Sequence, residues 1–199
     1  MKLLTLFPHS VGQFKLNVDN KKILKHIKKL KYKKTHVKYT DSSSLISKDY
    51  SVLNQLPLLK KQILKSVQEY SNSHNYFHKK YKIQCSWCTL TKEKCFGQFH
   101  YHAHSFISGV YYPKKIKDCS IVFQNPFQNL FWNQDVKEHN YINSTEFTLP
   151  IEDNMLLLFH HYIKHKININ LNSEDRYSIA FNVTPYGSLG YEDVQIKIL

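Results

Sequence analysis

From about Tyr81 to its end, the chain consists of short apolar or alternating runs separated by turn signals. Examples of these signals are Asn125-Pro126, Asp153-Asn154 and Pro185-Tyr186-Gly187. Many short strands at this spacing are typical of a β-sandwich or a β-barrel. The predicted strands span 83–90, 96–103, 107–112, 119–124, 145–150, 155–159, 163–170, 176–183 and 191–199.

The first 80 residues predict two helices rather than strands. One spans about 21–30, with Asn20 as a candidate N-cap, and the other begins near Pro57, a favourable first-turn residue. In both segments apolar residues recur at intervals of three and four, so each helix has one apolar face. We therefore expect a single domain over 1–199, in which a helical support (1–80) packs outside a β core (81–199).

The charge of the chain is strongly positive and comes almost entirely from lysine. Its 199 residues have a net charge of +13, and nine lysines with no acidic residue lie between Asp19 and Asp41. Part of this excess reflects the codon bias of an AT-rich genome. Two interpretations of the segment Lys21–Lys38 stay open, an anion-binding face that contacts nucleic acid and a solvated helix face with its loop.

Neither a membrane span nor a disulfide framework is expected. The longest strictly apolar run, Met155–Phe159, has five residues, and the stretch Leu3–Phe7 is too short for a secretory signal. Cys85 and Cys88 form a C-x-x-C pair within a predicted strand, where positions three apart point to opposite faces. The sequence thus favours reduced cysteines in a cytoplasmic protein.

Histidines are concentrated in two segments of the β region. His100, His102 and His104 alternate along a predicted strand, which would place all three on one face. Two imidazoles at i and i+2 can chelate one metal ion, and a third ligand from a distant strand would complete a facial set. By spacing alone, that third ligand is any one of His160, His161 and His165.

The single arginine of the chain, Arg176, is a second informative position. It shares a strand face with Ser178 in the predicted strand 176–183. Arginine binds a carboxylate through two parallel hydrogen bonds, which lysine cannot reproduce. In a chain that uses lysine everywhere else, one arginine indicates a carboxylate-binding site, although an ion pair with Glu174 or Asp175 would also explain it. Tyr111 and Tyr112, at the end of the run after the histidines, pack a core and carry hydroxyls that can reach a ligand.

These motifs, in this order, resemble a known family. The segments are His100–Tyr112, which reads H-x-H followed by S-x-x-S-G-V-Y-Y, then Leu157–Phe159 with His165, and Arg176–Asn182, which reads R-x-S-I-x-F-N. They resemble Fe(II)- and 2-oxoglutarate-dependent dioxygenases of a small-protein group related to prolyl hydroxylases and common in marine bacteria and phages. The resemblance covers nearly the whole chain.

The resemblance implies a mainly β fold, the double-stranded β-helix or jelly roll, with N-terminal helices packed outside it. It implies a hydroxylase whose Fe(II) ligands are His100, His102 and His165. It implies that Arg176, with Ser178 and Tyr112, holds the far carboxylate of 2-oxoglutarate. The other requirements are O2 and ascorbate as a supporting reductant, and the location would be the host cytoplasm if a phage encodes the protein.

This sequence departs from the pattern at several positions. Most of the superfamily has an Asp or Glu where this chain has His102, so the metal site would consist of three neutral imidazoles. The family's W-x-N becomes Trp87-Cys88-Thr89, and its D-P-R becomes Asn125-Pro126-Phe127. The substrate stays open among an amino acid, a peptidyl side chain, a nucleobase and a small metabolite.

Two alternatives remain. One is a cupin-like three-histidine metalloenzyme that does not use 2-oxoglutarate, although residues 105–109 lack the glutamate that the cupin pattern requires. The other is a basic module without catalytic activity that binds nucleic acid through Lys21–Lys38. Its binding would depend steeply on salt and not on metal.

Overall fold

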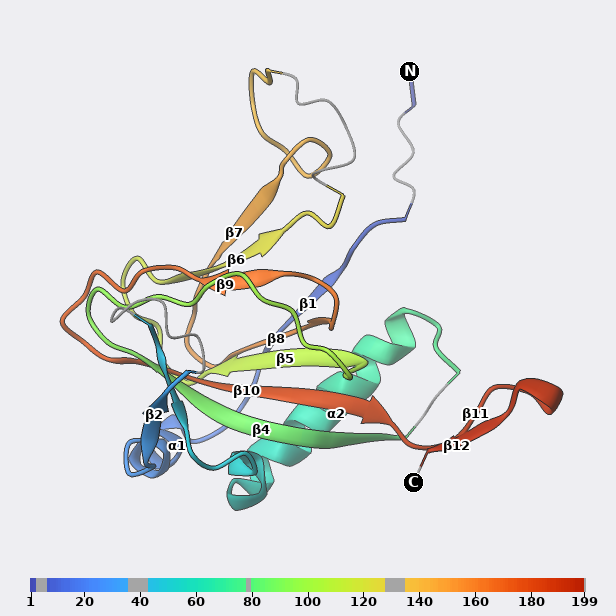
Figure 1. Ribbon diagram of the computed structural model, residues 1–199, viewed down its shortest axis with the longest axis horizontal. Coiled ribbons are helices and arrows are strands. Elements are labelled where there is room, and N and C mark those ends of the chain that lie inside the picture. Colours follow the sequence, from blue (N-terminus) through green and yellow to red (C-terminus); the bar gives the residue numbers. More distant parts are fainter. Residues whose placement is uncertain (3–6, 36–42, 78–79, 128–134, 199) are drawn as a thin grey trace.

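The computed structural model describes residues 1–2, 7–35, 43–77, 80–127 and 135–198. Its largest feature is a seven-stranded sheet of order β1-β8-β5-β10-β4-β3-β2, in which neighbouring strands are antiparallel (Figure 1). The strands are β1 (Val11–Lys15), β2 (Tyr32–Lys34), β3 (Leu45–Ser47), β4 (Tyr81–Thr91), β5 (Ile107–Tyr112), β8 (Met155–His160) and β10 (Arg176–Pro185). The prediction of a mainly β chain is confirmed.

A smaller sheet lies over one face of the large one (Figure 1). It has the order β7-β6-β9, with β6 (Ser120–Gln124), β7 (Glu146–Pro150) and β9 (His165–Ile167). One buried cluster joins the two sheets, because it contains Tyr112 of β5, Phe159 of β8 and both Ile121 and Phe123 of β6. The space between the sheets is therefore part core and, as described below, part cavity.

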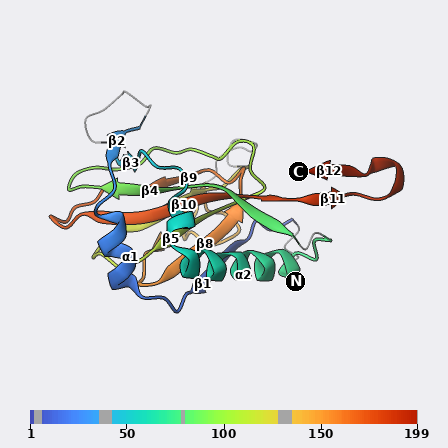
Figure 2. The same cartoon turned by 90° about the horizontal axis from the view of Figure 1, so that it is seen from below.

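Two helices cover the opposite face of the large sheet (Figure 2). They are α1 (Asn20–Ile27) and α2 (Pro57–Ser73), and the short 3-10 helix η1 (Val52–Gln55) leads into α2. The four apolar positions of α2 that recur at helical spacing are all buried, and they share a cluster with residues of β5, β8 and β10. These positions are Leu59, Ile63, Val67 and Tyr70.

The cap of α1 differs from the predicted one by a single residue. Asp19, not Asn20, is the N-cap, and its side chain accepts hydrogen bonds from the backbone N–H groups of Lys21 and Lys22 at 3.0 and 3.3 Å. The Asn20 side chain is used elsewhere, because its amide donates to the carbonyl of Pro113 and its oxygen accepts from the Tyr111 hydroxyl. A long-range contact therefore decides which of the two residues caps the helix.

Several predicted boundaries are corrected by the pairing of the strands. The first 80 residues are not only helical, since they also supply β1, β2 and β3. The predicted strand 96–103 is an extended loop that makes only isolated bridges, at Phe96 and His100. The predicted strand 163–170 shortens to β9. The predicted strand 191–199 divides into the 3-10 helix η2 (Glu192–Val194) and β12 (Ile196–Ile198), which pairs with β11 (Gly187–Leu189) in a hairpin that projects from the body (Figure 1).

The cysteines follow the strand spacing. On β4, Cys88 is buried in the cluster beneath the helices, whereas Cys85 lines the cavity on the other face. All four cysteines are free thiols. In the described part of the chain, no helix is long and apolar enough to cross a membrane. Residues 3–6 of the short N-terminal apolar stretch, and Lys38 of the lysine-rich segment, lie outside the described residues.

Gly109 of β5 lies directly opposite Leu158 of β8 and Phe181 of β10, and its replacement by alanine should destabilise the fold. A Cβ at this position would lie 2.3 Å from Cζ of Phe181 and 2.8 Å from a methyl of Leu158. Such overpacking costs about 1–3 kcal/mol. Gly187 is the matched control, because a Cβ there meets nothing within 4 Å and only its φ of +93° opposes the change. We expect Gly109→Ala to lower the free energy of unfolding in urea by more than Gly187→Ala does. Equal losses would contradict this account of β5.

Candidate metal centre and cosubstrate pocket

The backbone brings His100 and His165 together from segments 65 residues apart. Each donates its N–H to the carbonyl of the other at 3.0 Å, which makes the pair a closed antiparallel bridge. Two residues further on, the N–H of His102 donates to the carbonyl of His161, also at 3.0 Å. The loop that carries the H-x-H motif is therefore fixed alongside the start of β9.

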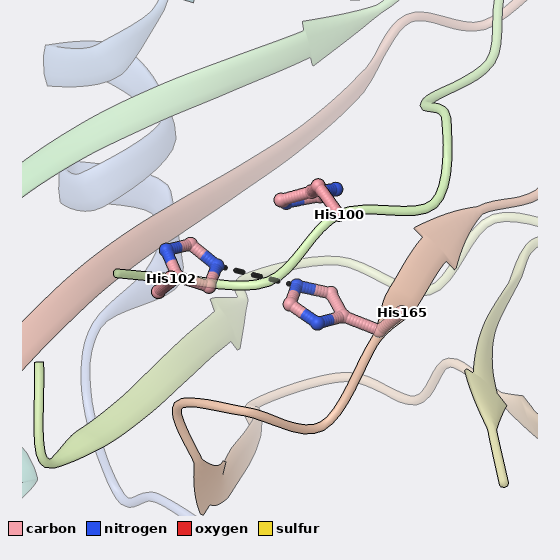
Figure 3. A group of neighbouring side chains, drawn as sticks. All are labelled: His100, His102 and His165. Carbon is pink, nitrogen blue, oxygen red and sulfur yellow. Dashed lines mark hydrogen bonds between the residues drawn. The ribbon is translucent and has the colours of Figure 1, made fainter. Parts of the chain in front are cut away.

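The rings of His100, His102 and His165 converge (Figure 3). One nitrogen of each ring lies within 4.8 Å of the others, and the Nε2 atoms of His102 and His165 are 3.3 Å apart. Nδ1 of His100 lies 2.8 Å from the carbonyl of Gln98, and Nδ1 of His165 lies 3.0 Å from that of Ile163. A proton on Nδ1 satisfies each carbonyl and leaves an Nε2 lone pair for a metal ion, the usual orientation of a ligating histidine.

Burial favours the neutral form of His102 and His165, which is the form that binds metals. Burial, followed by the neighbouring His100 and His161, lowers the pKa of His102 to about 4. Burial, with His100 and His102 nearby, also lowers the pKa of His165 well below its ordinary value. The group contains no carboxylate. Three imidazole nitrogen donors fit Fe(II), for which imidazole is a suitable ligand.

The lowered pKa of His102 predicts that the metal-free protein loses stability in mild acid. The unfolded chain takes up a proton near pH 6.5, whereas the folded chain takes it up only near pH 4. Between these values the unfolded state binds more protons, so stability falls as the pH falls, by about 1.4 kcal/mol per pH unit from this side chain. Urea unfolding at pH 7, 6 and 5 measures the slope, which His102→Gln should reduce. An unchanged slope in the variant would contradict the assignment.

The remaining candidate histidines lie outside the metal group. His104 is exposed and has a φ of 59°, in the left-handed region, so the alternation predicted for an H-x-H-x-H strand ends at His102. Nε2 of His160 lies 3.0 Å from the Tyr76 hydroxyl, on the helix-covered face. Nδ1 of His161 lies 3.1 Å from the carbonyl of His102 and so supports the loop that carries the ligand.

Arg176, the single arginine, is buried at the first position of β10 and is 1% exposed. Its Nη1 donates to the carbonyl of Ser120 at 3.4 Å, while Nε and Nη2 have no hydrogen-bond partner among the described residues. The hydroxyl of Tyr112 is likewise buried without a partner, and Ser178 is buried two residues along the same face of β10. A buried guanidinium with two free donors is costly unless an anion pairs with it. The alternative ion pair with Glu174 is not formed, because that carboxylate pairs with Lys114.

A cavity of about 490 Å³ joins the two sets of residues. His100, His102, His165, Tyr112 and Ser178 all line it, while Arg176 lies just beyond Ser178 on β10. Sequence reasoning missed the aromatic part of its wall, which includes Tyr50, Trp87, Phe96 and Phe99. Of these, only Trp87 carried a sequence signal, as the first residue of the altered W-x-N motif, and its ring centroid lies 5.6 Å from that of His102.

Comparison with known proteins agrees with this architecture. Residues 85–182 match the family model described as "Putative 2OG-Fe(II) oxygenase". No curated protein matches the sequence. The matched segment contains H-x-H, His165 and Arg176. Over these residues the chain is similar to the 2-oxoglutarate- and Fe(II)-dependent oxygenases.

Solved structures share the fold at low sequence identity. The epimerase SnoN from nogalamycin biosynthesis has a TM-score of 0.63 at 12% identity, covering 90% of this chain and 80% of SnoN. HygX from Streptomyces hygroscopicus, solved with nickel and 2-oxoglutarate, has a TM-score of 0.62 at 11% identity, covering 89% and 83%. A prolyl-4-hydroxylase from Pseudomonas putida has a TM-score of 0.58 at 9% identity, covering 87% and 92%. These likenesses establish the jelly-roll type of fold.

Proposed function

We propose that this protein is an Fe(II)- and 2-oxoglutarate-dependent hydroxylase. His100, His102 and His165 would hold Fe(II), and Arg176, Ser178 and Tyr112 would hold the far carboxylate of 2-oxoglutarate. One observation carries the proposal. Three convergent imidazoles line a cavity together with Ser178 and Tyr112, and a buried arginine with two free donor nitrogens lies two residues before Ser178 on the same strand. A cupin-like enzyme without 2-oxoglutarate would leave that arginine without a partner.

When bound, iron, 2-oxoglutarate and O2 supply oxidative decarboxylation coupled to oxidation of a substrate C–H bond. The chain positions these groups and excludes water. The guanidinium of Arg176 presents two donors to a carboxylate, and the hydroxyls of Ser178 and Tyr112 can add neutral bonds. The aromatic wall beside His102 limits water at the reacting centre.

The domain organisation follows from the same proposal. We take 1–199 as one catalytic domain in which α1 and α2 brace the large sheet from outside. The free cysteines are consistent with a reducing, cytoplasmic setting. The substrate would be a small molecule, an amino acid or a peptidyl side chain. The lysines of α1 are surface residues on the helix-covered side, and among the described residues none lines the cavity.

Coupled binding tests this proposal directly. Under anaerobic conditions, 2-oxoglutarate should bind tightly only after Fe(II) is present, and the two together should produce the visible absorption band of the chelate. Metal alone or 2-oxoglutarate alone should not produce it. Binding of 2-oxoglutarate that is indifferent to the metal would argue against a shared site.

Tyr112→Phe should weaken 2-oxoglutarate binding moderately. The hydroxyl of Tyr112 is fully buried without a partner, and burial raises its pKa to about 12 although Arg176 opposes the rise, so it stays a neutral donor. Loss of one neutral hydrogen bond costs about 1 kcal/mol, roughly a fivefold change in affinity. Titration of 2-oxoglutarate into the Fe(II) protein measures it. Unchanged affinity would remove Tyr112 from the cosubstrate site.

A further inference from the structure

The wall of the cavity is uncharged apart from its histidines. Among the described lining residues there is no Asp, Glu, Lys or Arg, and the polar ones are hydroxyl, thiol or amide side chains. Aromatic and aliphatic groups make up most of the remaining surface, including Tyr50, Trp87, Phe96, Phe99 and Phe159. Away from Arg176 and the metal ligands, a charged group would lose its hydration in this cavity without gaining a partner, so the part of the substrate near the metal centre should be uncharged and apolar.

In the described part of the chain, one unpaired positive charge lies at the rim of this cavity. Lys33 lies opposite Ile46 in the β2–β3 pair, on the sheet face that also carries Thr35, and both Ile46 and Thr35 line the cavity. Its Nζ lies over the ring of Tyr50, 5.2 Å from the centroid. Lys33 is half-buried, and within the described chain no carboxylate pairs with it.

Two other charged side chains, Lys166 and Asp49, already have an ion-pair partner or hydrogen-bond partners. Nζ of Lys166 lies over Phe99, but it also pairs with Glu146 at 3.6 Å. The carboxylate of Asp49, beside Tyr50 in sequence, accepts hydrogen bonds from Ser51 and Gln55. Among the described residues, the cation at the entrance that has no ion-pair partner is therefore Lys33.

We infer that the substrate presents an uncharged, apolar group to the cavity and carries a negative charge that pairs with Lys33 at the rim. This inference rests on the proposed function, because it assigns the part of the cavity that 2-oxoglutarate leaves free. Any substrate of this kind has an aryl or alkyl group next to a negatively charged group. Its source is either a free hydrophobic acid or an apolar side chain beside an acidic residue in a peptide.

The test uses three probes of similar shape and different charge. Calorimetry measures the binding of 1-naphthylacetate, 1-naphthylacetamide and 1-naphthylmethylammonium to protein saturated with Mn(II) and 2-oxoglutarate. The acid should bind about fivefold more tightly than the amide, as expected for one partly exposed ion pair of about 1 kcal/mol, and the cation should bind most weakly. The peptides N-acetyl-Asp-Phe-amide and N-acetyl-Lys-Phe-amide give the second arm. Tighter binding of the acidic peptide than of naphthylacetate identifies a peptidyl source, and the reverse a free acid.

Substitutions in β2 test whether Lys33 is the residue that pairs with the negative charge of the probe. Lys33→Met should remove the preference for the acid over the amide and leave Mn(II) and 2-oxoglutarate binding unchanged. Lys34→Met is the matched control, because its side chain points to the opposite face of β2 and should leave the preference intact. The inference is overturned if the cation binds as well as the acid, if Lys33→Met keeps the preference, or if no probe binds while Mn(II) and 2-oxoglutarate do. Failure of Mn(II) and 2-oxoglutarate to bind would instead overturn the proposed function.

Discussion

Replacing His165 with alanine is expected to abolish iron binding at the centre and all turnover of 2-oxoglutarate. The side chain is buried, and its Nε2 lies 3.3 Å from that of His102 while its Nδ1 is held by the carbonyl of Ile163. Loss of a residue that only orients a ligand already costs about 10- to 100-fold in metal affinity, and loss of the ligand itself should cost more. Metal content after equilibrium dialysis against Fe(II) under anaerobic conditions gives the measurement.

The H-x-H-x-H segment provides the control for this experiment. His104 is exposed, lies in left-handed backbone and belongs to the same loop as His100 and His102. His104→Ala should therefore retain iron and turnover within about twofold, as expected for a surface change of about 0.5 kcal/mol or less. Retention of iron by His165→Ala, or its loss from His104→Ala, would show that the ligand set is wrong.

Arg176→Lys is expected to weaken 2-oxoglutarate binding by about 10- to 150-fold and to leave iron binding unchanged. Lysine keeps the charge, but it replaces the two free donors of the guanidinium with one point donor of different reach. A charge-assisted bond in a buried site is worth about 1.5–3 kcal/mol, which corresponds to that range of affinity. Ser178→Ala removes one neutral donor and should have a smaller effect in the same direction. Titration of 2-oxoglutarate into the anaerobic Fe(II) protein compares the three. Equal affinities for wild type and Arg176→Lys would favour an enzyme that does not use 2-oxoglutarate.

Replacing Arg176 with an apolar residue is expected to raise the stability of the ligand-free protein, although it removes 2-oxoglutarate binding. Without 2-oxoglutarate its charge is buried, with a single hydrogen bond to the carbonyl of Ser120. Replacing a buried, poorly paired charge by an apolar side chain of similar volume often stabilises a fold by about 1–4 kcal/mol. Arg176→Met should thus raise the free energy of unfolding of the ligand-free protein while it removes cosubstrate binding. If Arg176→Met lowers both the free energy of unfolding and 2-oxoglutarate binding, Arg176 stabilises the fold rather than binding the ligand.

Strands with a strong local pattern could be predicted from the sequence, and strands that depend on a partner could not. The run Met155–Phe159 is apolar throughout because β8 is buried between β1 and β5, so its signal is local. By contrast, β1 has a mixed sequence with Gly12 in it, and its pairing with β8 holds it in place. The three-residue strands β2 and β3 likewise depend on each other and on β4.

The residues of the metal site could be predicted from the sequence, but the backbone conformation that brings them together could not. Spacing allowed any of His160, His161 and His165, and only the family resemblance selected His165. The structure then brings this residue to His100 and His102 through a bridge between a loop and a strand. A regular strand would have kept His104 on the same face, and its left-handed backbone could not be read from the sequence. The aromatic wall was not predictable, because Tyr50 and Phe96 line one cavity only when the segments around β3 and after β4 come together.

The most direct test of the central claim is O2-dependent formation of succinate from 2-oxoglutarate by the purified protein with Fe(II) and ascorbate. Slow turnover without substrate should give succinate in step with the 2-oxoglutarate consumed. His165→Ala and Arg176→Met should fall to the level of buffer with iron, while His104→Ala should match wild type. Succinate formation by wild type that does not exceed that of His165→Ala would contradict the assignment of this cavity as a 2-oxoglutarate oxygenase site.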